Sequence, residues 1–260
     1  MDLVRASHLY KVFGKNERQV IERLKAGESR EELASLGTAA VIDVSFEVAK
    51  GETFVVMGLS GSGKSTLIRM INGLWSPSEG TVEVAGKVVS GMNDAQMRAL
   101  RRDHVSMVFQ HFALLPHLTV RENAAYGLKL QGKLKQKERL EKANEWLNTV
   151  GLNGWGDKYP HQLSGGMQQR VGLARALAAE TDILLMDEAF SALDPLIRRE
   201  MQDQLLELQG ALNKTIIFIT HDLNEAMYLG DHIAVMRNGR VAQIGTSDEI
   251  LTQPADDYVA

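Results

Sequence analysis

The fold of this chain is decided by residues 58–66, which read Gly58-Leu59-Ser60-Gly61-Ser62-Gly63-Lys64-Ser65-Thr66. They match the pattern G-x-x-x-x-G-K-[ST], and the apolar residues 54–57 directly before them are typical of a strand. A strand, a glycine-rich turn and a helix in this order point backbone N–H groups and a positive helix end at an anion. An ordinary glycine-rich turn before a helix is the alternative, but it requires neither the lysine nor the hydroxyl residues. We therefore expect a nucleoside-triphosphate site.

The side chains of this loop have separate expected tasks. Lys64 reaches the β- and γ-phosphates and balances their charge, while the Ser65 hydroxyl ligates Mg²⁺. The glycines allow the tight turns between these positions. The residues expected to bind the nucleotide in this loop are Gly58, Ser60, Gly61, Ser62, Gly63, Lys64, Ser65 and Thr66.

Two adjacent carboxylates, Asp187 and Glu188, follow an apolar run that predicts a buried strand over 182–186. Adjacent side chains on a strand point in opposite directions, so the two acids are expected to have different roles. Asp187 would hold the metal ion, and Glu188 would polarise the attacking water. A strand that simply ends in an acidic turn is the alternative, but it becomes improbable beside a phosphate loop.

A second glycine-rich segment, LSGGMQQR at 163–170, precedes the acidic strand by about twenty residues. A serine and two glycines at a helix N-terminus form another anion-binding nest. Ser164 or Gly165 could also serve simply as the helix cap, and both interpretations can hold together.

With these motifs in this order, the chain resembles the ATP-binding-cassette family over essentially its whole length. The LSGG segment with its neighbouring glutamines is the family's signature. The resemblance implies ATP and Mg²⁺ as cofactors and in-line attack of water on the γ-phosphate. Glu188, His221 and Lys64 would be the catalytic residues. His221 follows a strand predicted over 215–220 and would contact the γ-phosphate.

The resemblance also assigns residues outside the two glycine-rich segments. Gln110, after the strand predicted over 105–109, would contact Mg²⁺ or water, and Phe13 would stack on the adenine ring. The Mg²⁺ ligands would be Ser65, Gln110 and Asp187.

In this family the signature of one copy closes over the ATP held by another. The residues implied to complete the partner's site are Ser164, Gly165, Gly166 and Gln168, and Asp194 lies in the loop implied to cross the dimer interface. The chain has one set of motifs, so a second cassette must come from another chain. A homodimer is its simplest source.

The expected fold is α/β, a single cassette domain over 1–260. A phosphate-loop core would span 1–110 and 162–260, with a mixed, largely parallel sheet, flanking helices and an antiparallel β part. The helical periodicity over 111–161 predicts an inserted α-helical subdomain. A further insertion at 15–38 is expected to form two short helices, the second begun by a Ser29–Glu32 capping box. Helices this short are stable only when they are packed, so they are expected to dock on another surface.

Composition restricts the partners. The formal net charge is −4 over 260 residues, so there is no global electrostatic case for nucleic acid. The absence of cysteine excludes disulfides. No secretory signal and no span of 18 apolar residues is visible, so a membrane role requires a partner chain.

The insertion at 15–38, residues 57–66 and residues 185–198 together resemble bacterial ATPases that import glycine betaine, proline and related quaternary amines. This resemblance implies integral-membrane permease partners, an extracytoplasmic solute-binding protein, and a peripheral position on the cytoplasmic face of the bacterial inner membrane. In such members a regulatory domain often follows residues 253–258. The chain ends at Ala260, so none is expected in this chain.

Alternative functions stay open at this point. The solute could be trimethylamine oxide, carnitine or an amino acid rather than glycine betaine, choline or proline. A soluble cassette ATPase with no transport role is a further alternative, although neither a long coiled coil nor a second cassette is visible.

Overall fold

The computed structural model describes residues 2–110, 112–191 and 193–260. The chain divides into two compact units, the first comprising Met1–Met97 with Ile217–Ala260 and the second Arg98–Ile216. Within the described residues, every helix is too short or too polar to cross a bilayer.

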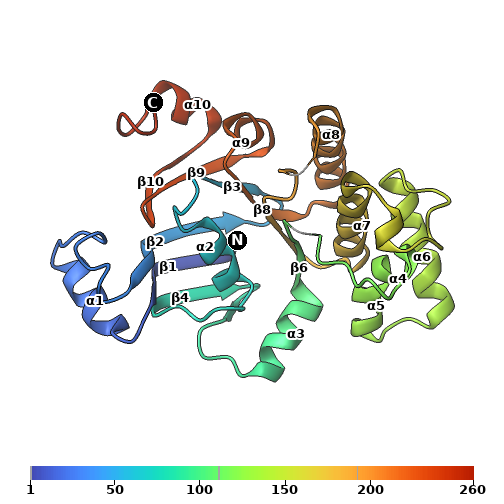
Figure 1. Cartoon of the computed structure of the whole chain (residues 1–260), viewed down its shortest axis with the longest axis horizontal. Coiled ribbons are helices and arrows are strands. Elements are labelled where there is room, and N and C mark those ends of the chain that lie inside the picture. The colour runs from blue at the N-terminus through green and yellow to red at the C-terminus, as the bar shows by residue number, and fades with distance from the viewer. Residues whose placement is uncertain (1, 111, 192) are drawn as a thin grey trace. The chain divides into compact units, whose positions relative to one another are not determined.

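An antiparallel sheet forms the N-terminal part of the first unit (Figure 1). Its strands lie in the order β2-β1-β4-β5, with bounds Thr38–Ala49, Asp2–Phe13, Glu79–Val84 and Lys87–Val88. The alternating apolar residues of β2 are buried on one face, as their period of two predicts: Ile42, Val44, Phe46 and Val48. β4 and β5 form an antiparallel hairpin whose turn is Ala85-Gly86.

The insertion between β1 and β2 packs on this same sheet. Its helix α1 (Glu17–Lys25) buries Val20, Ile21 and Leu24 in a cluster that includes residues of β1 and β2, so the expected docking is within the chain itself. In Figure 1, α1 lies beside these strands. The apolar face of the insertion is thus buried by its own unit.

The second helix predicted for the insertion is wrong, because residues 30–36 form turns. The Ser29–Glu32 capping box does form: the Ser29 amide donates to Glu32 Oε2 at 2.8 Å, and the Glu32 amide donates to Ser29 Oγ at 3.3 Å. Gly37 follows before enough turns accumulate to offset the cost of helix nucleation. Leu33 still reaches the buried cluster from this turn segment.

Leu33→Ala is expected to lower the free energy of unfolding by about 2–4 kcal/mol, because Leu33 is completely buried and its removal leaves a cavity. Urea denaturation measures the change. Glu31→Ala, at an exposed position of the same segment, is the control and should change little. Equal midpoints for the two variants would show that the insertion does not depend on its packing against the sheet.

The first unit also holds a second set of strands, which positions the phosphate loop. β3 (Thr53–Met57) lies between β9 (His232–Arg237) and β8 (Thr215–Thr220), of which the first two residues are assigned to the second unit. β10 (Arg240–Gly245) pairs antiparallel with β9. Helix α2 (Lys64–Ile71) follows β3, and α9 (Leu223–Leu229) and α10 (Ser247–Thr252) come later in the chain. β3 is buried along almost its whole length, which is typical of a central parallel strand.

The second unit has a pair of parallel strands, β6 (Val105–Val108) and β7 (Ile183–Asp187). Helices α4, α5 and α6 form one group that packs on α7. Helix α3 (Asp94–His104) begins four residues before this unit and continues into it. The other helices of the unit are α4 (Val120–Ala124), α5 (Tyr126–Gln131), α6 (Gln136–Thr149), η1 (Pro160–Gln162), α7 (Gly165–Ala178) and α8 (Pro195–Leu212). α4, α5 and α6 lie within the region 111–161 that is predicted to be helical.

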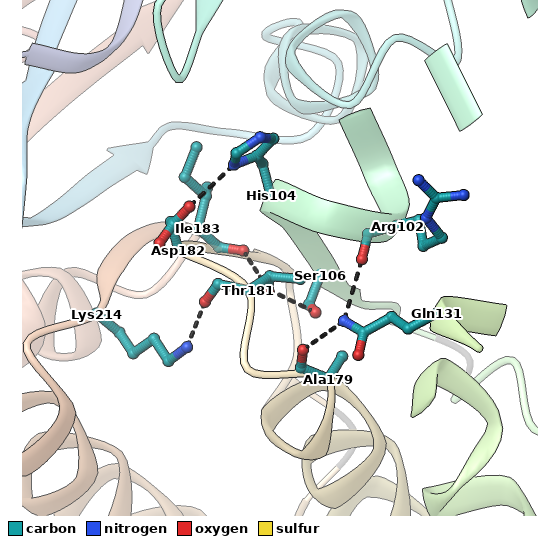
Figure 2. Close-up of polar contacts among 9 residues, drawn as sticks. All are labelled: Arg102, His104, Ser106, Gln131, Ala179, Thr181, Asp182, Ile183 and Lys214. Atoms are coloured by element: carbon teal, nitrogen blue, oxygen red, sulfur yellow. Dashed lines mark hydrogen bonds and ion pairs between the residues drawn. The ribbon is translucent and has the colours of Figure 1, made fainter. Parts of the chain in front are cut away.

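A network of polar contacts links α3, α5 and the end of α7 near the starts of β6 and β7 (Figure 2). Gln131 Nε2 donates to the carbonyl oxygens of Arg102 and Ala179, at 3.2 and 2.7 Å. The Thr181 hydroxyl donates to Ser106 Oγ at 2.8 Å. Because β6 and β7 are parallel, their carboxyl ends lie side by side, with Gln110 and Glu188 just beyond them.

Candidate functional site

The phosphate loop has a backbone that only glycine can form at two positions. Gly58 has φ 153°, and a Cβ there would lie 2.3 Å from the Met236 carbonyl oxygen. Gly63, the N-cap of α2, has φ 103°, and a Cβ would lie 2.2 Å from the Ala40 carbonyl oxygen. The loop is therefore held between β2 and β9 by close backbone approach.

Two polar groups of this loop suit a polyphosphate. Lys64 is buried, and its Nζ donates to the carbonyl oxygens of Gly58 and Leu59 at 2.7 and 3.0 Å. Ser62 Oγ is also buried and has no hydrogen-bond partner among the described residues. Buried polar groups normally find partners, so a phosphate oxygen is a fitting partner for Ser62 Oγ. The Lys64 ammonium group supplies the positive charge that a phosphate binds.

His221 lies beside the loop in the first unit. It lines a cavity of about 260 Å³ together with Gly58 and Leu59. The C-terminal residues Tyr258 and Ala260 line the same cavity. The structure thus places the predicted γ-phosphate contact next to the loop that would hold the phosphate.

Phe13, the predicted adenine platform, stands at the end of β1 with 38 % of its surface exposed. Its ring meets the Trp75 ring edge-on, with centroids 5.0 Å apart, and Lys11 Nζ lies 5.3 Å from its centroid. Sequence reasoning missed Trp75, whose signal is an aromatic residue just after the helix that follows the loop. The adenine contact of Phe13 stays a prediction.

In the second unit, Gln110 and Glu188 come together at the ends of the paired strands. Gln110 Nε2 donates to Glu188 Oε2 at 3.2 Å. Asp187 is buried at the end of β7, whereas Glu188 is partly exposed and takes a left-handed conformation with φ 45°. Ser191 stabilises this turn, because both its amide and its hydroxyl donate to the Glu188 carbonyl oxygen, at 3.1 and 2.9 Å. The two acids thus have different surroundings, and their separate roles stay a prediction.

The signature segment begins helix α7. Ser164 is its N-cap and accepts a hydrogen bond from the Met167 amide at 3.3 Å, while Ser164 and Gly165 are exposed. The capping interpretation therefore holds, and an exposed helix N-terminus leaves the anion-binding one open. Gln168 Nε2 donates to the Leu163 carbonyl oxygen at 3.2 Å.

Asp194, predicted for the dimer interface, is the N-cap of α8. Its Oδ1 accepts from the Ile197 amide at 3.1 Å, and Pro195 occupies the first turn. The interface role stays a prediction. Two residues of the predicted segments, His111 and Ala192, lie outside the described residues.

Of the predicted Mg²⁺ ligands, Ser65 belongs to the first unit, and Gln110 and Asp187 belong to the second. Among the described residues, no group of three or more His, Cys, Asp or Glu side chains forms a metal cage. Mg²⁺ commonly binds through one or two protein oxygens together with substrate phosphates and water. The oxygen donors present are of the kind that this mode uses.

Comparisons with known proteins extend over nearly all of the chain. The ABC transporter family model matches residues 41–191. The chain is 54% identical over 98% of its length to the glycine betaine transport ATP-binding protein OpuAA of Bacillus subtilis, and 53% identical over 97% to the glycine betaine/proline betaine protein ProV of Escherichia coli. It spans 62% and 63% of those two proteins.

Two further comparisons concern substrate and assembly. The trimethylamine N-oxide transport protein TmoW of Ruegeria pomeroyi is 48% identical over 99% of this chain and 76% of its own length. A dimeric structure of the ATP-binding cassette MJ0796 bound to ADP and Pi is 32% identical, with a TM-score of 0.81, covering 94% of this chain and 98% of that one. The predicted α/β cassette fold is confirmed by this similarity.

Proposed function

Because the chain belongs to the ABC transporter family of ATP-binding proteins, we propose that it hydrolyses ATP to drive uptake of glycine betaine or a related quaternary amine. The observation that carries this proposal is the 53–54% identity to glycine betaine transport ATP-binding proteins over 97–98% of the chain. At this coverage, the compared region includes the insertion at 15–38 as well as the nucleotide motifs.

Within the proposed reaction, the first unit binds the phosphates. The loop amides, Ser62 Oγ and Lys64 Nζ would contact the phosphate oxygens. Lys64 would stabilise the negative charge that develops on those oxygens in the transition state. His221, which shares a cavity with the loop, would hold the γ-phosphate. Mg²⁺, held through Ser65, Gln110 and Asp187, would neutralise charge on the phosphates when bound.

The second unit would supply the base. The Glu188 carboxylate would accept a hydrogen bond from the attacking water and so increase the nucleophilicity of that water. Gln110 donates to the same carboxylate, so it orients that group and responds to its charge. The strained backbone at Glu188 fits this assignment, since residues in left-handed conformations concentrate at functional sites.

The proposed assembly is a homodimer in which Ser164, Gly165, Gly166 and Gln168 of one copy complete the site of the other, with Asp194 at the interface. The dimeric state of the similar cassette MJ0796 supports this arrangement. A permease and an extracytoplasmic solute-binding protein would complete the transporter. The chain would then act at the cytoplasmic face of the inner membrane.

A second candidate substrate is trimethylamine oxide, favoured by the 48% identity to TmoW. Glycine betaine ranks first because its relatives are more similar to this chain. Both molecules carry a trimethylated nitrogen, so one binding protein could discriminate between them only through the rest of the molecule.

Transport by the whole complex tests the proposal. The tagged chain is isolated from native membranes with its permease and reconstituted in proteoliposomes containing ATP, with the solute-binding protein added outside. Uptake of radiolabelled glycine betaine is expected to require ATP and to disappear with Lys64→Ala. Competition by unlabelled trimethylamine oxide, carnitine, choline and proline ranks the substrates. Intact ATP hydrolysis without uptake of any of them would reject the substrate class.

A further inference from the structure

The segment just after Gln110 has an unusual backbone. Phe112 and Ala113 have φ 55° and 48°, so two consecutive residues with a Cβ are left-handed. L-residues avoid this region because Cβ approaches the neighbouring carbonyl oxygen, and such pairs persist only when surrounding contacts hold them. Gln110, which donates to Glu188, lies two residues before this turn in the sequence.

Arg175 of helix α7 contacts both residues of the turn. Its Nη1 donates to the Ala113 carbonyl oxygen at 2.6 Å, and its Nη2 donates to the Phe112 carbonyl oxygen at 3.1 Å. Burial lowers the pKa of the Arg175 guanidinium, yet an arginine stays charged throughout the accessible pH range. The partly desolvated, charged guanidinium group of Arg175 therefore donates to two adjacent carbonyl groups from two nitrogens. A single ammonium group does not reproduce this arrangement.

The turn also packs directly on α7, beside two of its glycines. A Cβ at Gly165 would lie 3.7 Å from Phe112 Cζ, and a Cβ at Gly172 would lie 3.7 Å from the Phe112 carbonyl oxygen. Gly165, Gly172 and Arg175 recur at helical spacing along one face of α7. The same helix that begins with the signature serine thus supports the turn after Gln110.

We propose that Arg175 is a positioning residue for ATP hydrolysis, which holds the turn at Phe112 and Ala113 on α7 and so keeps Gln110 against Glu188. The proposal rests on the proposed ATPase function. Arg175 itself contacts neither Gln110 nor Glu188 through a described hydrogen bond, so its effect passes through the backbone. A turn that loosens would let Gln110 leave the carboxylate it orients.

Arg175→Lys tests the proposal, since lysine keeps the positive charge but lacks the two donor nitrogens of the planar guanidinium group. The maximal rate of ATP hydrolysis is expected to fall about tenfold or more, because small misplacements in an active site have large effects. The KM for ATP should stay within about twofold, because the phosphate loop is untouched. Hydrogen–deuterium exchange should rise in the peptide that follows Gln110, which gives a readout independent of activity.

Gln131→Met is the matched control. Gln131 also donates to two backbone carbonyl oxygens of the same unit, those of Arg102 and Ala179, but it lies in the network near the starts of β6 and β7 (Figure 2). Its loss should lower thermal stability without changing kcat or exchange after Gln110. An equal loss of kcat in both variants would overturn the proposal in favour of general destabilisation.

A second variant separates positioning from folding. Ala113→Gly removes the Cβ that disfavours the left-handed turn, so it should leave the wild type nearly unchanged and restore much of the rate lost in Arg175→Lys. Unchanged kcat in Arg175→Lys, or no rescue by glycine, overturns the proposal. If Glu188→Gln abolishes hydrolysis while Arg175→Lys does not alter it, the proposed function stands and only the role of Arg175 fails. A wild-type chain that does not hydrolyse ATP overturns both.

Discussion

Glu188→Gln is expected to lower ATP turnover by about 10³-fold while ATP binding is retained, because a positioned general base contributes about 10²–10⁴-fold. Glutamine has the shape of glutamate, and its amide oxygen can still accept the hydrogen bond that Gln110 Nε2 donates at 3.2 Å. It cannot accept a proton from water. Phosphate release and equilibrium binding of a fluorescent ATP analogue measure the two properties separately.

The control for this variant is Asp182→Asn, which changes a carboxylate just before the first residue of β7. Asp182 pairs with His104 at 2.9 Å, and turnover should be unaffected. Turnover like that of the wild type in Glu188→Gln would remove Glu188 from the catalytic role. Loss of ATP binding together with turnover would instead indicate that the left-handed backbone at Glu188 supports the fold of the site.

Lys64→Ala is expected to weaken ATP binding by at least about tenfold, since a hydrogen bond to a charged group contributes about 1.5–3 kcal/mol. Turnover should fall further, by about 10³-fold, because the charge on the transferred phosphoryl group is greatest in the transition state. Calorimetric titration gives the dissociation constant, and a coupled assay gives the rate.

Lys64 also donates to the Gly58 and Leu59 carbonyl oxygens, so the thermal unfolding of the variant is measured without nucleotide. Lys50→Ala removes an exposed cation from the turn before β3 and serves as the charge control. A normal dissociation constant in Lys64→Ala, with Lys50→Ala also normal, would contradict the phosphate role. A drop in melting temperature as large as the loss of binding would assign the effect to folding.

Much of the fold was predictable because its signals are local. The strand over 215–220 has the same bounds in the structure, and the turn at Asn238-Gly239 joins β9 to β10 as its residues indicate. The second predicted helix of the insertion does not form, because the segment after the Ser29–Glu32 cap is too short to offset the cost of helix nucleation. Helix α3 is mostly polar, with Met97 and Leu100 buried on one side.

The sequence by itself determined that this chain has a phosphate loop, an acidic strand end and a signature helix, because those motifs depend on backbone freedom and on neighbouring side chains. Tertiary structure alone decided which distant groups meet. Gln110 and Glu188 lie 78 positions apart, and Arg175 reaches carbonyl groups 62 and 63 positions away. Such contacts arise from the pairing of β6 with β7 and from packing on α7, which no short stretch of residues encodes.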